Sequence, residues 1–313
     1  MNKATKIRLN YIIGLIVTVI LLWAIYSQVQ NQLIQVDVGT AFHEGAHCYL
    51  LLSFLLLPVN LGLEIYKWKL LVASAQPISN ATAVRSFFAG LALSILTPNR
   101  IGEYPGRIIY LKQKNTPRLI SITFLGMFSQ FLCLMIFGIA GLVYYNIMTP
   151  SYWAKLVLVA TIVASIVGFL IFWNFEKWSR IIEHFEWLSK FKTYTKLLKR
   201  FTIKEQLSIL AISMLRFVTY TIQYLLLLYW MHIEIDLLTG FCMACMFFFS
   251  MAIVPSIALA EMGIRGQLSL LFFQQFTSNK IGILIATIVL WFINLIIPAI
   301  VGSTLWIKLR LIK

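Results

Sequence analysis

Pro98-Asn-Arg-Ile-Gly-Glu-Tyr-Pro-Gly-Arg107 interrupts a short apolar segment with a proline and then places Glu103 and Arg107 four residues apart. A second stretch, Pro255-Ser-Ile-Ala-Leu-Ala-Glu-Met-Gly-Ile-Arg265, repeats this arrangement with Glu261 and Arg265. An ionised side chain at the centre of a bilayer costs about 2.5–3.5 kcal/mol even on lenient scales. The same pair in both halves of an apolar chain therefore indicates a polar path through a membrane.

The composition is that of an integral membrane protein. Of the 313 residues, 60% are hydrophobic and 12% are charged, whereas soluble domains are about half apolar and a quarter charged. The net charge of +15 is spread over several loops and gives no support to a nucleic-acid partner. The sequence has no P-loop motif, and we expect no cofactor.

Six segments are long and apolar enough to cross a hydrocarbon core, which takes about 20 helical residues. We predict full spans at 9–27, 45–66, 119–146, 154–174, 207–231 and 281–306. Nearly all Lys and Arg residues between the spans fall on one side, together with both termini, whereas Lys155 and Lys280 fall on the other. By the positive-inside rule we place both termini in the cytoplasm and expect the cytoplasmic (inner) membrane of a bacterium.

Two further apolar segments are predicted to enter the membrane and return on the same side. Ser86 to Thr97 makes roughly 18 Å of helix, too short to cross, and basic residues flank it on both sides. If the segment 237–254 crossed, the last helix would leave Lys308, Arg310 and Lys313 outside. We therefore predict re-entrant hairpins at about 81–111, from the cytoplasm, and at about 237–276, from the outer face.

The fold class that follows is an all-α polytopic membrane protein, with about six full transmembrane helices plus two re-entrant helical hairpins in an inverted-topology repeat. Residues 1–150 form the first membrane repeat and residues 151–313 the second, which begins with a span and a cytoplasmic amphipathic segment, 175–206. Broken helices at corresponding positions of two inverted repeats are typical of a transporter's substrate site. Both hairpin tips are expected to meet in the protein interior, because non-helical backbone is not tolerated against lipid.

The charged residues of the two hairpins suit an anionic head group. A guanidinium presents a planar fork that matches phosphate oxygens, and a Glu one turn away holds it in place. Arg216 in the fifth span needs a carboxylate or a ligand phosphate as partner. In the alternative interpretation, each Glu–Arg pair is a buried salt bridge that only offsets its own desolvation. The candidate substrate-binding residues are Asn99, Arg100, Gly102, Glu103, Arg107, Arg216, Glu261, Gly263 and Arg265, and the expected hairpin breaks are Pro98, Pro105 and Pro255.

One motif points to a different chemistry. His43-Glu-Gly-Ala-His47 matches H-E-x-x-H, which on a helix offers two zinc ligands and Glu44 as general base. A catalytic zinc needs a third protein ligand, and Glu64 would lie about 25 Å further along a continuous helix. We expect no catalytic residues and no metal, and we keep His43 and His47 as candidate ligands for the alternative, a membrane zinc metalloenzyme.

The two motifs also resemble the signature stretches of the lysylphosphatidylglycerol synthase transmembrane region, a family of flippase-like integral membrane proteins. In its bifunctional members this region moves aminoacylated phosphatidylglycerol between leaflets, and a separate C-terminal domain transfers the aminoacyl group. Because the sequence ends at Lys313, the resemblance implies translocation without the aminoacyltransferase domain. The stretch Ile257-Ala-Leu-Ala260 departs from the glycine-rich sequence of many relatives. The matching residues are Pro98, Gly102, Glu103 and Arg107, and Pro255, Glu261, Gly263 and Arg265.

The function expected from these features is lipid translocation of an anionic or aminoacylated phospholipid between membrane leaflets. A polyprenyl-phosphate lipid carrier is an alternative substrate. The zinc metalloenzyme and a non-transporting partner of a lipid- or glycan-modifying enzyme are the alternatives that involve no transport. The expected partners are membrane lipids with phosphate head groups, with a second copy of the chain and a lipid- or glycan-modifying enzyme as further candidates.

Overall fold

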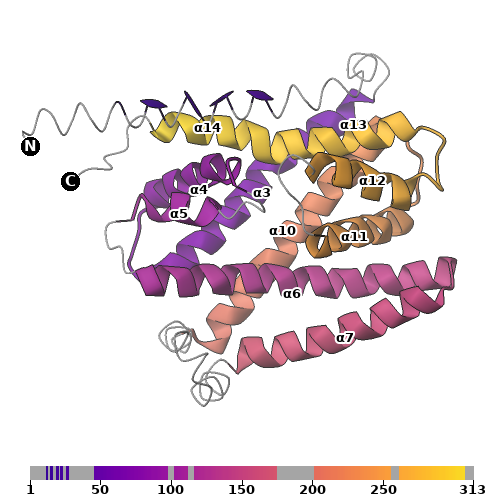
Figure 1. Cartoon of the computed structure of the whole chain (residues 1–313), viewed down its shortest axis with the longest axis horizontal. Helices are drawn as coiled ribbons and strands as arrows, with labels where there is room; N and C mark the ends of the chain where they lie inside the picture. Colours follow the sequence, from indigo (N-terminus) through magenta and orange to yellow (C-terminus); the bar gives the residue numbers. More distant parts are fainter. Residues whose placement is uncertain are drawn as a thin grey trace, which may run out of the picture.

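The structure, a computed structural model, describes residues 46–97, 102–111, 116–174, 201–254 and 261–306, together with isolated positions between 12 and 27. Within these ranges every regular element is helical (Figure 1). The elements are α3 (His47–Ala73), α4 (Asn80–Ser94), α5 (Glu103–Ile108), α6 (Thr116–Met148), α7 (Tyr152–Trp173), α10 (Ile203–Trp230), α11 (Leu237–Ile253), α12 (Glu261–Phe273), α13 (Lys280–Trp291), the π-helical η3 (Phe292–Ile296) and α14 (Ile297–Trp306).

Five helices are long and apolar enough to cross a membrane: α3, α6 from Arg118, α7, α10, and the continuous segment Lys280–Trp306. Candidate spans are thus present at five of the six predicted positions: 45–66, 119–146, 154–174, 207–231 and 281–306. The span predicted at 9–27 lies outside the continuously described residues, and so do residues 175–200 of the amphipathic segment predicted at 175–206. The last residues of that segment belong to the start of α10, which begins at Ile203. Since α3 continues to Ala73, Lys67 and Lys69 belong to this helix and not to the loop in which the predicted boundary placed them.

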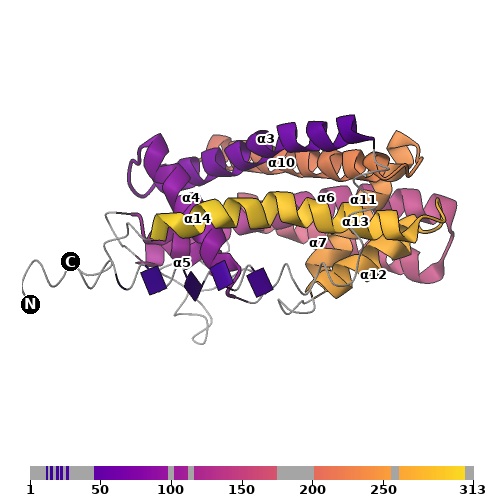
Figure 2. The same cartoon turned by 90° about the horizontal axis from the view of Figure 1, so that it is seen from above.

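The long helices α6, α7 and α13–α14 run along the molecule, while α3 and α10 cross them obliquely and lie side by side (Figures 1 and 2). The short helices α4 and α5 gather toward one end of the molecule, and α11 and α12 toward the other. Each short pair therefore approaches the middle from its own end. The largest apolar core cluster lies around α10, α11, α12 and α13, where Tyr224, Phe247 and Phe273 are fully buried.

Side chains at the helix ends define where the elements begin. Thr202 and Glu205 form a capping box at the start of α10, in which the Glu205 carboxylate accepts the Thr202 N–H at 2.8 Å. At the start of α11, the Asp236 carboxylate accepts the N–H groups of Leu238 and Thr239, both at 3.1 Å. Such caps contribute about 1 kcal/mol each and fix the register of the helix that follows. Starting at this cap, α11 ends at Ile253 and is shorter than the candidate spans.

Glycines let the short helices approach their neighbours closely. A Cβ atom on Gly90 of α4 would lie 2.5 Å from the Glu103 carbonyl oxygen, and one on Gly106 of α5 would lie 2.7 Å from the Gly90 Cα. On the other face of α4, a Cβ on Gly302 of α14 would collide with the Phe88 carbonyl oxygen. Small residues at helix crossings are the usual means by which membrane helices gain packing contacts. The position of α5 thus depends on backbone contact with α4.

Substituting Gly106→Ala should destabilise the fold, because the backbone it meets cannot move aside as a flexible side chain would. Overpacking of this kind costs about 1–3 kcal/mol, and we expect a lower midpoint of thermal unfolding in detergent. Gly62→Ala is the matched control, since no atom lies within 4 Å of the added Cβ, and a helical Gly costs about 0.5–1 kcal/mol relative to Ala. Equal midpoints for the two variants would contradict the packing described for α4 and α5.

Candidate functional site

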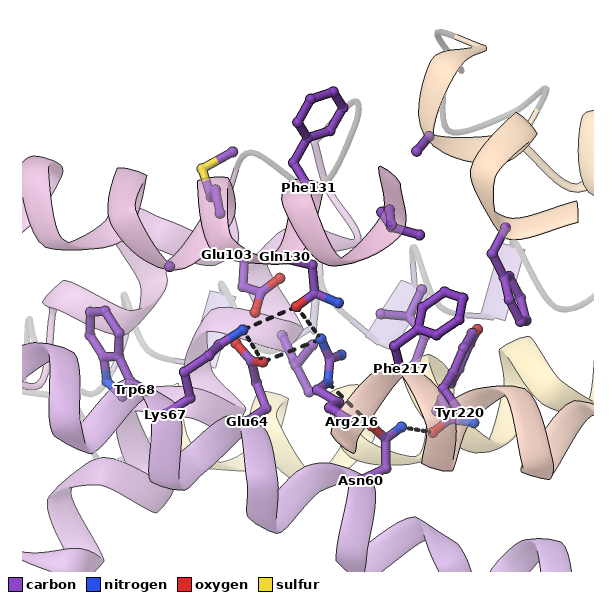
Figure 3. A pocket seen from close by; sticks show the side chains of 18 of the residues that line it. Asn60, Glu64, Lys67, Trp68, Glu103, Gln130, Phe131, Arg216, Phe217 and Tyr220 are labelled. Carbon is purple, nitrogen blue, oxygen red and sulfur yellow. Dashed lines mark hydrogen bonds and ion pairs between the residues drawn. The ribbon is translucent and has the colours of Figure 1, made fainter. Parts of the chain in front are cut away.

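A cavity of about 680 Å³ lies in the middle of the protein, bordered by α3, α4, α5, α6, α10, α11, α12 and the last span (Figure 3). Its volume falls within the range of about 300–1,000 Å³ that is typical of ligand pockets. Residues of both motifs line it, with Glu103 and Arg107 contributed by α5 and Arg265 by α12. The two short helix pairs, which come from opposite ends of the molecule, therefore face one common space.

A carboxylate on α3, Glu64, gathers three basic groups from three helices. Its Oε2 atom lies 2.8 Å from Lys67 Nζ and 3.2 Å from Arg216 Nη1, and its Oε1 atom lies 3.1 Å from Arg107 Nη2. Arg107 also pairs with Glu103, one helical turn earlier on α5. The pairing of Glu103 with Arg107 that the sequence predicts is thus present, and it is part of a larger network that we call the Glu64 network: Glu64, Lys67, Glu103, Arg107 and Arg216.

The Glu64 network carries an excess of positive charge. Three cations face two carboxylates, so its formal charge is +1 when all groups are ionised. The side chains of Lys67, Arg107 and Glu64 are only 3%, 5% and 9% exposed, whereas that of Arg216 is 29% exposed. A buried charge without a counter-charge is costly, and more so inside a membrane. The network is therefore suited to receive an anion on the side where Arg216 is accessible.

Arg107 is held by its surroundings as well as by its ion pairs. Its guanidinium lies over the rings of Trp68 and Phe87, 5.2 Å and 5.1 Å from their centroids, in cation–π geometry. Its backbone carbonyl accepts the Ser86 hydroxyl at 2.5 Å, and that hydroxyl accepts the Trp68 indole N–H at 3.0 Å. Its Nε atom is buried and has no acceptor among the described residues. This side chain is fixed in place and retains an unused donor.

A second polar group joins the central helices next to the Glu64 network. Asn60 donates to Asn294 Oδ1 at 2.6 Å, and Arg216 donates to Gln130 Oε1 at 2.9 Å and to Asn60 Oδ1 at 3.2 Å. Gln130 also accepts from Lys67 Nζ at 3.0 Å. Asn294 lies in the π-helical η3, and insertions of this kind in α-helices are frequent at functional sites. These hydrogen bonds connect α3, α6, α10 and the last span.

The structure brings four of the predicted site residues to the cavity: Glu103, Arg107, Arg216 and Arg265. Gly102 is not among the lining residues; a Cβ there would lie 2.6 Å from the Leu93 carbonyl oxygen, so this glycine permits packing against the end of α4. Nothing lies within 4 Å of a Cβ on Gly263. Outside the described part of the chain lie Pro98, Asn99, Arg100, Pro255 and the side chain of Glu261.

Pro105 does not break a helix. It is the third residue of α5, in the first turn, where backbone N–H groups have no intrahelical acceptor and proline is tolerated. The interruption lies upstream, between the end of α4 at Ser94 and the start of α5 at Glu103.

The H-E-x-x-H motif lies mostly outside the described residues, because His43 and Glu44 are not among them. His47 is the first residue of α3, which continues past Pro58 to Ala73, so Glu64 lies far from His47 along the same helix. Among the residues that are described, no group of three or more His, Cys, Asp or Glu side chains could hold a metal ion. The zinc-enzyme alternative stays a prediction.

Sequence reasoning missed several residues that make the site. From the sequence, Glu64 is expected only as a distant metal ligand, and Lys67 falls just beyond the span predicted at 45–66. Asn60 and Asn294 are not among the predicted site residues. A signal was present, because Asn60, Glu64 and Lys67 recur at spacings of four and three and so share one face of an apolar helix. Such a polar face inside a span points toward protein and not toward lipid.

Removing the Ser86 hydroxyl should loosen the attachment of Arg107. In Ser86→Ala the Trp68 N–H and the Arg107 carbonyl would both lose a buried partner, which costs about 1–3 kcal/mol. Ser94→Ala is the control on the same helix, since among the described residues the Ser94 hydroxyl donates only to the Leu91 carbonyl within α4. We expect a lower thermal midpoint for Ser86→Ala and little change for Ser94→Ala. Comparable losses in both variants would argue against the Ser86 bridge.

Comparison with known protein families identifies the family of this chain. The sequence matches the family described as Lysylphosphatidylglycerol synthase TM region over residues 11–302. No curated protein matches it. The matched range includes both Glu–Arg motifs, every charged residue of the Glu64 network and the five candidate spans almost completely. The chain is an integral membrane protein that belongs to the lysylphosphatidylglycerol synthase TM region family.

Proposed function

We propose that this protein moves a lipid with a phosphate head group, an anionic or aminoacylated phospholipid, from one membrane leaflet to the other. The observation that carries the proposal is the central cavity. It is lined by Arg265 of the second motif and by the Glu64 network, which includes Arg107 of the first motif and has an excess positive charge. The head group would pass through this cavity while the acyl chains stay in the surrounding lipid.

A phosphate group fits what the cavity offers. It would supply the negative charge that the Glu64 network lacks, and arginine forks match phosphate oxygens better than other basic groups do. Arg107 offers its Nε donor, and the buried Thr123 hydroxyl on the cavity wall also has no partner among the described residues. Aromatic side chains complete the wall, including Trp68, Phe217 and Tyr220 (Figure 3).

The helix contacts support an inverted-topology repeat with two re-entrant hairpins. We pair α3 with α10, the α4–α5 hairpin with the α11–α12 hairpin, and α6 with the last span. Under this pairing, the contact of α4 with α14 corresponds to the contact of α11 with α6, and both are present. Close glycine contacts occur at both, with Gly302 against α4 and Gly141 against α11. The contact between α3 and α10, which this pairing exchanges with each other, lies where a two-fold axis would pass.

The hydrogen-bonded polar residues between the central helices also obey this pairing of helices. Asn60 and Arg216 occupy the same place counted from the starts of α3 and α10, and so do Gln130 and Asn294 counted from the starts of α6 and α13. The hydrogen bond from Asn60 to Asn294 therefore corresponds to that from Arg216 to Gln130. The bond from Arg216 to Asn60 joins the two. Repeats related in this way commonly rock about a central site and expose it to each side in turn.

Exchange of a labelled phosphatidylglycerol between the leaflets of proteoliposomes tests the transport proposal. Arg107→Ala and Arg265→Ala should each reduce the exchange rate at least about tenfold, because each removes a charge-assisted contact to the phosphate, and tenfold corresponds to about 1.4 kcal/mol. Lys155→Ala is the matched control, because Lys155 is an exposed cation at the start of α7 and does not line the cavity.

Exchange that wild type performs and both arginine variants lose would support passage through the cavity. Exchange of a polyprenyl phosphate without exchange of phospholipids would favour the carrier-lipid alternative. Protein that folds in the vesicles and exchanges neither lipid would contradict the proposal.

The orientation is tested by labelling single cysteines in cells. In a Cys48→Ser background, which removes the exposed native cysteine, we expect Thr149→Cys to react with a membrane-impermeant maleimide in intact cells. Lys204→Cys should react only after the membrane is opened, because the positive-inside rule places the start of α10 in the cytoplasm. Both positions are exposed, at opposite ends of the spans. The reverse pattern would invert the proposed topology.

A further inference from the structure

We propose, as an extension that rests on the transport function above, that the Glu64 carboxylate and the phosphate of the ligand compete for one subsite, formed by Lys67, Arg107 and Arg216. Glu64 would thus be an internal substitute for the ligand's phosphate, and a phosphate group would bind by taking its place between the three cations.

The geometry around Glu64 is that of a bound anion. Its two oxygens receive Lys67 Nζ at 2.8 Å, Arg107 Nη2 at 3.1 Å and Arg216 Nη1 at 3.2 Å. The three cations come from α3, α5 and α10 and converge on one carboxylate. Figure 3 shows Lys67 and Arg216 at this carboxylate. Carboxylate and phosphate oxygens accept from the same arginine and lysine donors at similar distances. A phosphate at this place would meet the same three groups.

The three cations do not depend on Glu64 alone. Lys67 also donates to Gln130 at 3.0 Å, and Arg216 also donates to Gln130 at 2.9 Å and to Asn60 at 3.2 Å. Arg107 keeps Glu103 and the rings of Trp68 and Phe87. The subsite would therefore keep its shape when the Glu64 carboxylate moves away. Within the described part of the chain, in contrast, the partners of Glu64 are these three cations.

Glu103 shows the difference between a positioning carboxylate and a competing one. Among the described residues it pairs with Arg107 alone, from the preceding turn of the same helix, and its side chain is 18% exposed against 9% for Glu64. Removing Glu103 would take one contact from one cation. Removing Glu64 would release donors on all three cations at once, and would raise the formal charge of the network by the same single unit. Substituting either residue therefore changes the charge of the network equally, but the two carboxylates differ in how many of the cations they contact.

Competition of this kind suits a transporter. A pocket with three cations and no internal anion would hold a phosphate firmly and release it slowly, whereas transport requires a site that binds well enough to load and weakly enough to unload. A carboxylate that returns to the cations as the phosphate leaves keeps them paired at every stage. The three cations then need not be left without a counter-charge during the exchange.

The test measures the dissociation constant of dioctanoyl phosphatidylglycerol for the purified full chain in detergent, with Glu64→Gln beside wild type and Glu103→Gln. Glutamine keeps the size of the side chain and removes its charge. We expect Glu64→Gln to bind at least about tenfold more tightly than wild type, and Glu103→Gln to change the constant much less. Leaflet exchange by Glu64→Gln should be slower than by wild type despite the tighter binding.

Stability supplies a second readout. Without added anion, Glu64→Gln should have a lower thermal midpoint than wild type, because three buried cations lose a counter-charge. Phosphatidylglycerol should raise that midpoint by more than it raises the midpoints of wild type and Glu103→Gln, since a ligand that binds more tightly stabilises more at the same free concentration. If Glu64→Gln does not fold, Glu64→Asp withdraws the carboxylate by one methylene and should give a smaller gain in affinity.

Inorganic phosphate distinguishes the phosphate group from the rest of the lipid. Glu64→Gln should tighten the binding of inorganic phosphate and of dioctanoyl phosphatidylglycerol by similar factors, because Glu64 competes with the group that the two share. A gain confined to the lipid, or equal or weaker binding of both, would overturn the competition while leaving the transport proposal intact. Wild-type protein that binds neither probe would contradict the transport proposal itself.

Discussion

The arrangement around the cavity depends on the pairing of buried charges with Glu64. Charged groups at membrane depth must find partners inside the protein, because lipid offers none. Glu64 satisfies this requirement for Lys67, Arg107 and Arg216 together, and so ties α3 to α5 and α10. The crossing of these helices and the position of the cavity follow from one constraint, which apolar packing alone would not impose.

Packing determines how Arg107 reaches that carboxylate. Because α4 and α5 touch through Gly90 and Gly106, α5 lies close enough to α3 for the guanidinium to bridge them. The Ser86 hydroxyl connects the Arg107 carbonyl to the Trp68 indole and so fixes the backbone of Arg107 against α3 and α4. Small residues and one buried hydroxyl thus convert a short helix, which could not cross a membrane, into a rigid support for a charge.

Spans and local pairs could be predicted from the sequence, and long-range partners could not. Long apolar runs indicate α6, α7 and α10, and the spacing of Glu103 and Arg107 indicates their pairing because it is a property of one helix turn. Two lysines close together, Lys67 and Lys69, favour a span that ends at residue 66, whereas the helix continues to Ala73. The π-helical turn that carries Asn294 shifts the register of an otherwise ordinary apolar segment. No local pattern relates Asn294 to Asn60, which is distant in sequence.

The two halves share a layout and differ in chemistry. At the places of Glu64 and Lys67 on α3, the corresponding positions of α10 hold Tyr220 and Gln223, and Gln223 donates to the Ser53 carbonyl at 3.0 Å. On the proposed mechanism, a head group would therefore meet the ionic network on the α3 side of the cavity, and Tyr220 of α10 together with Arg265 of α12 on the other side. A difference in affinity between the two faces changes the relative occupancy of those faces by the phosphate. The size of this change is limited by the difference in binding free energy. The asymmetry thus governs how long each face holds the phosphate, whereas net direction must come from a separate source of free energy.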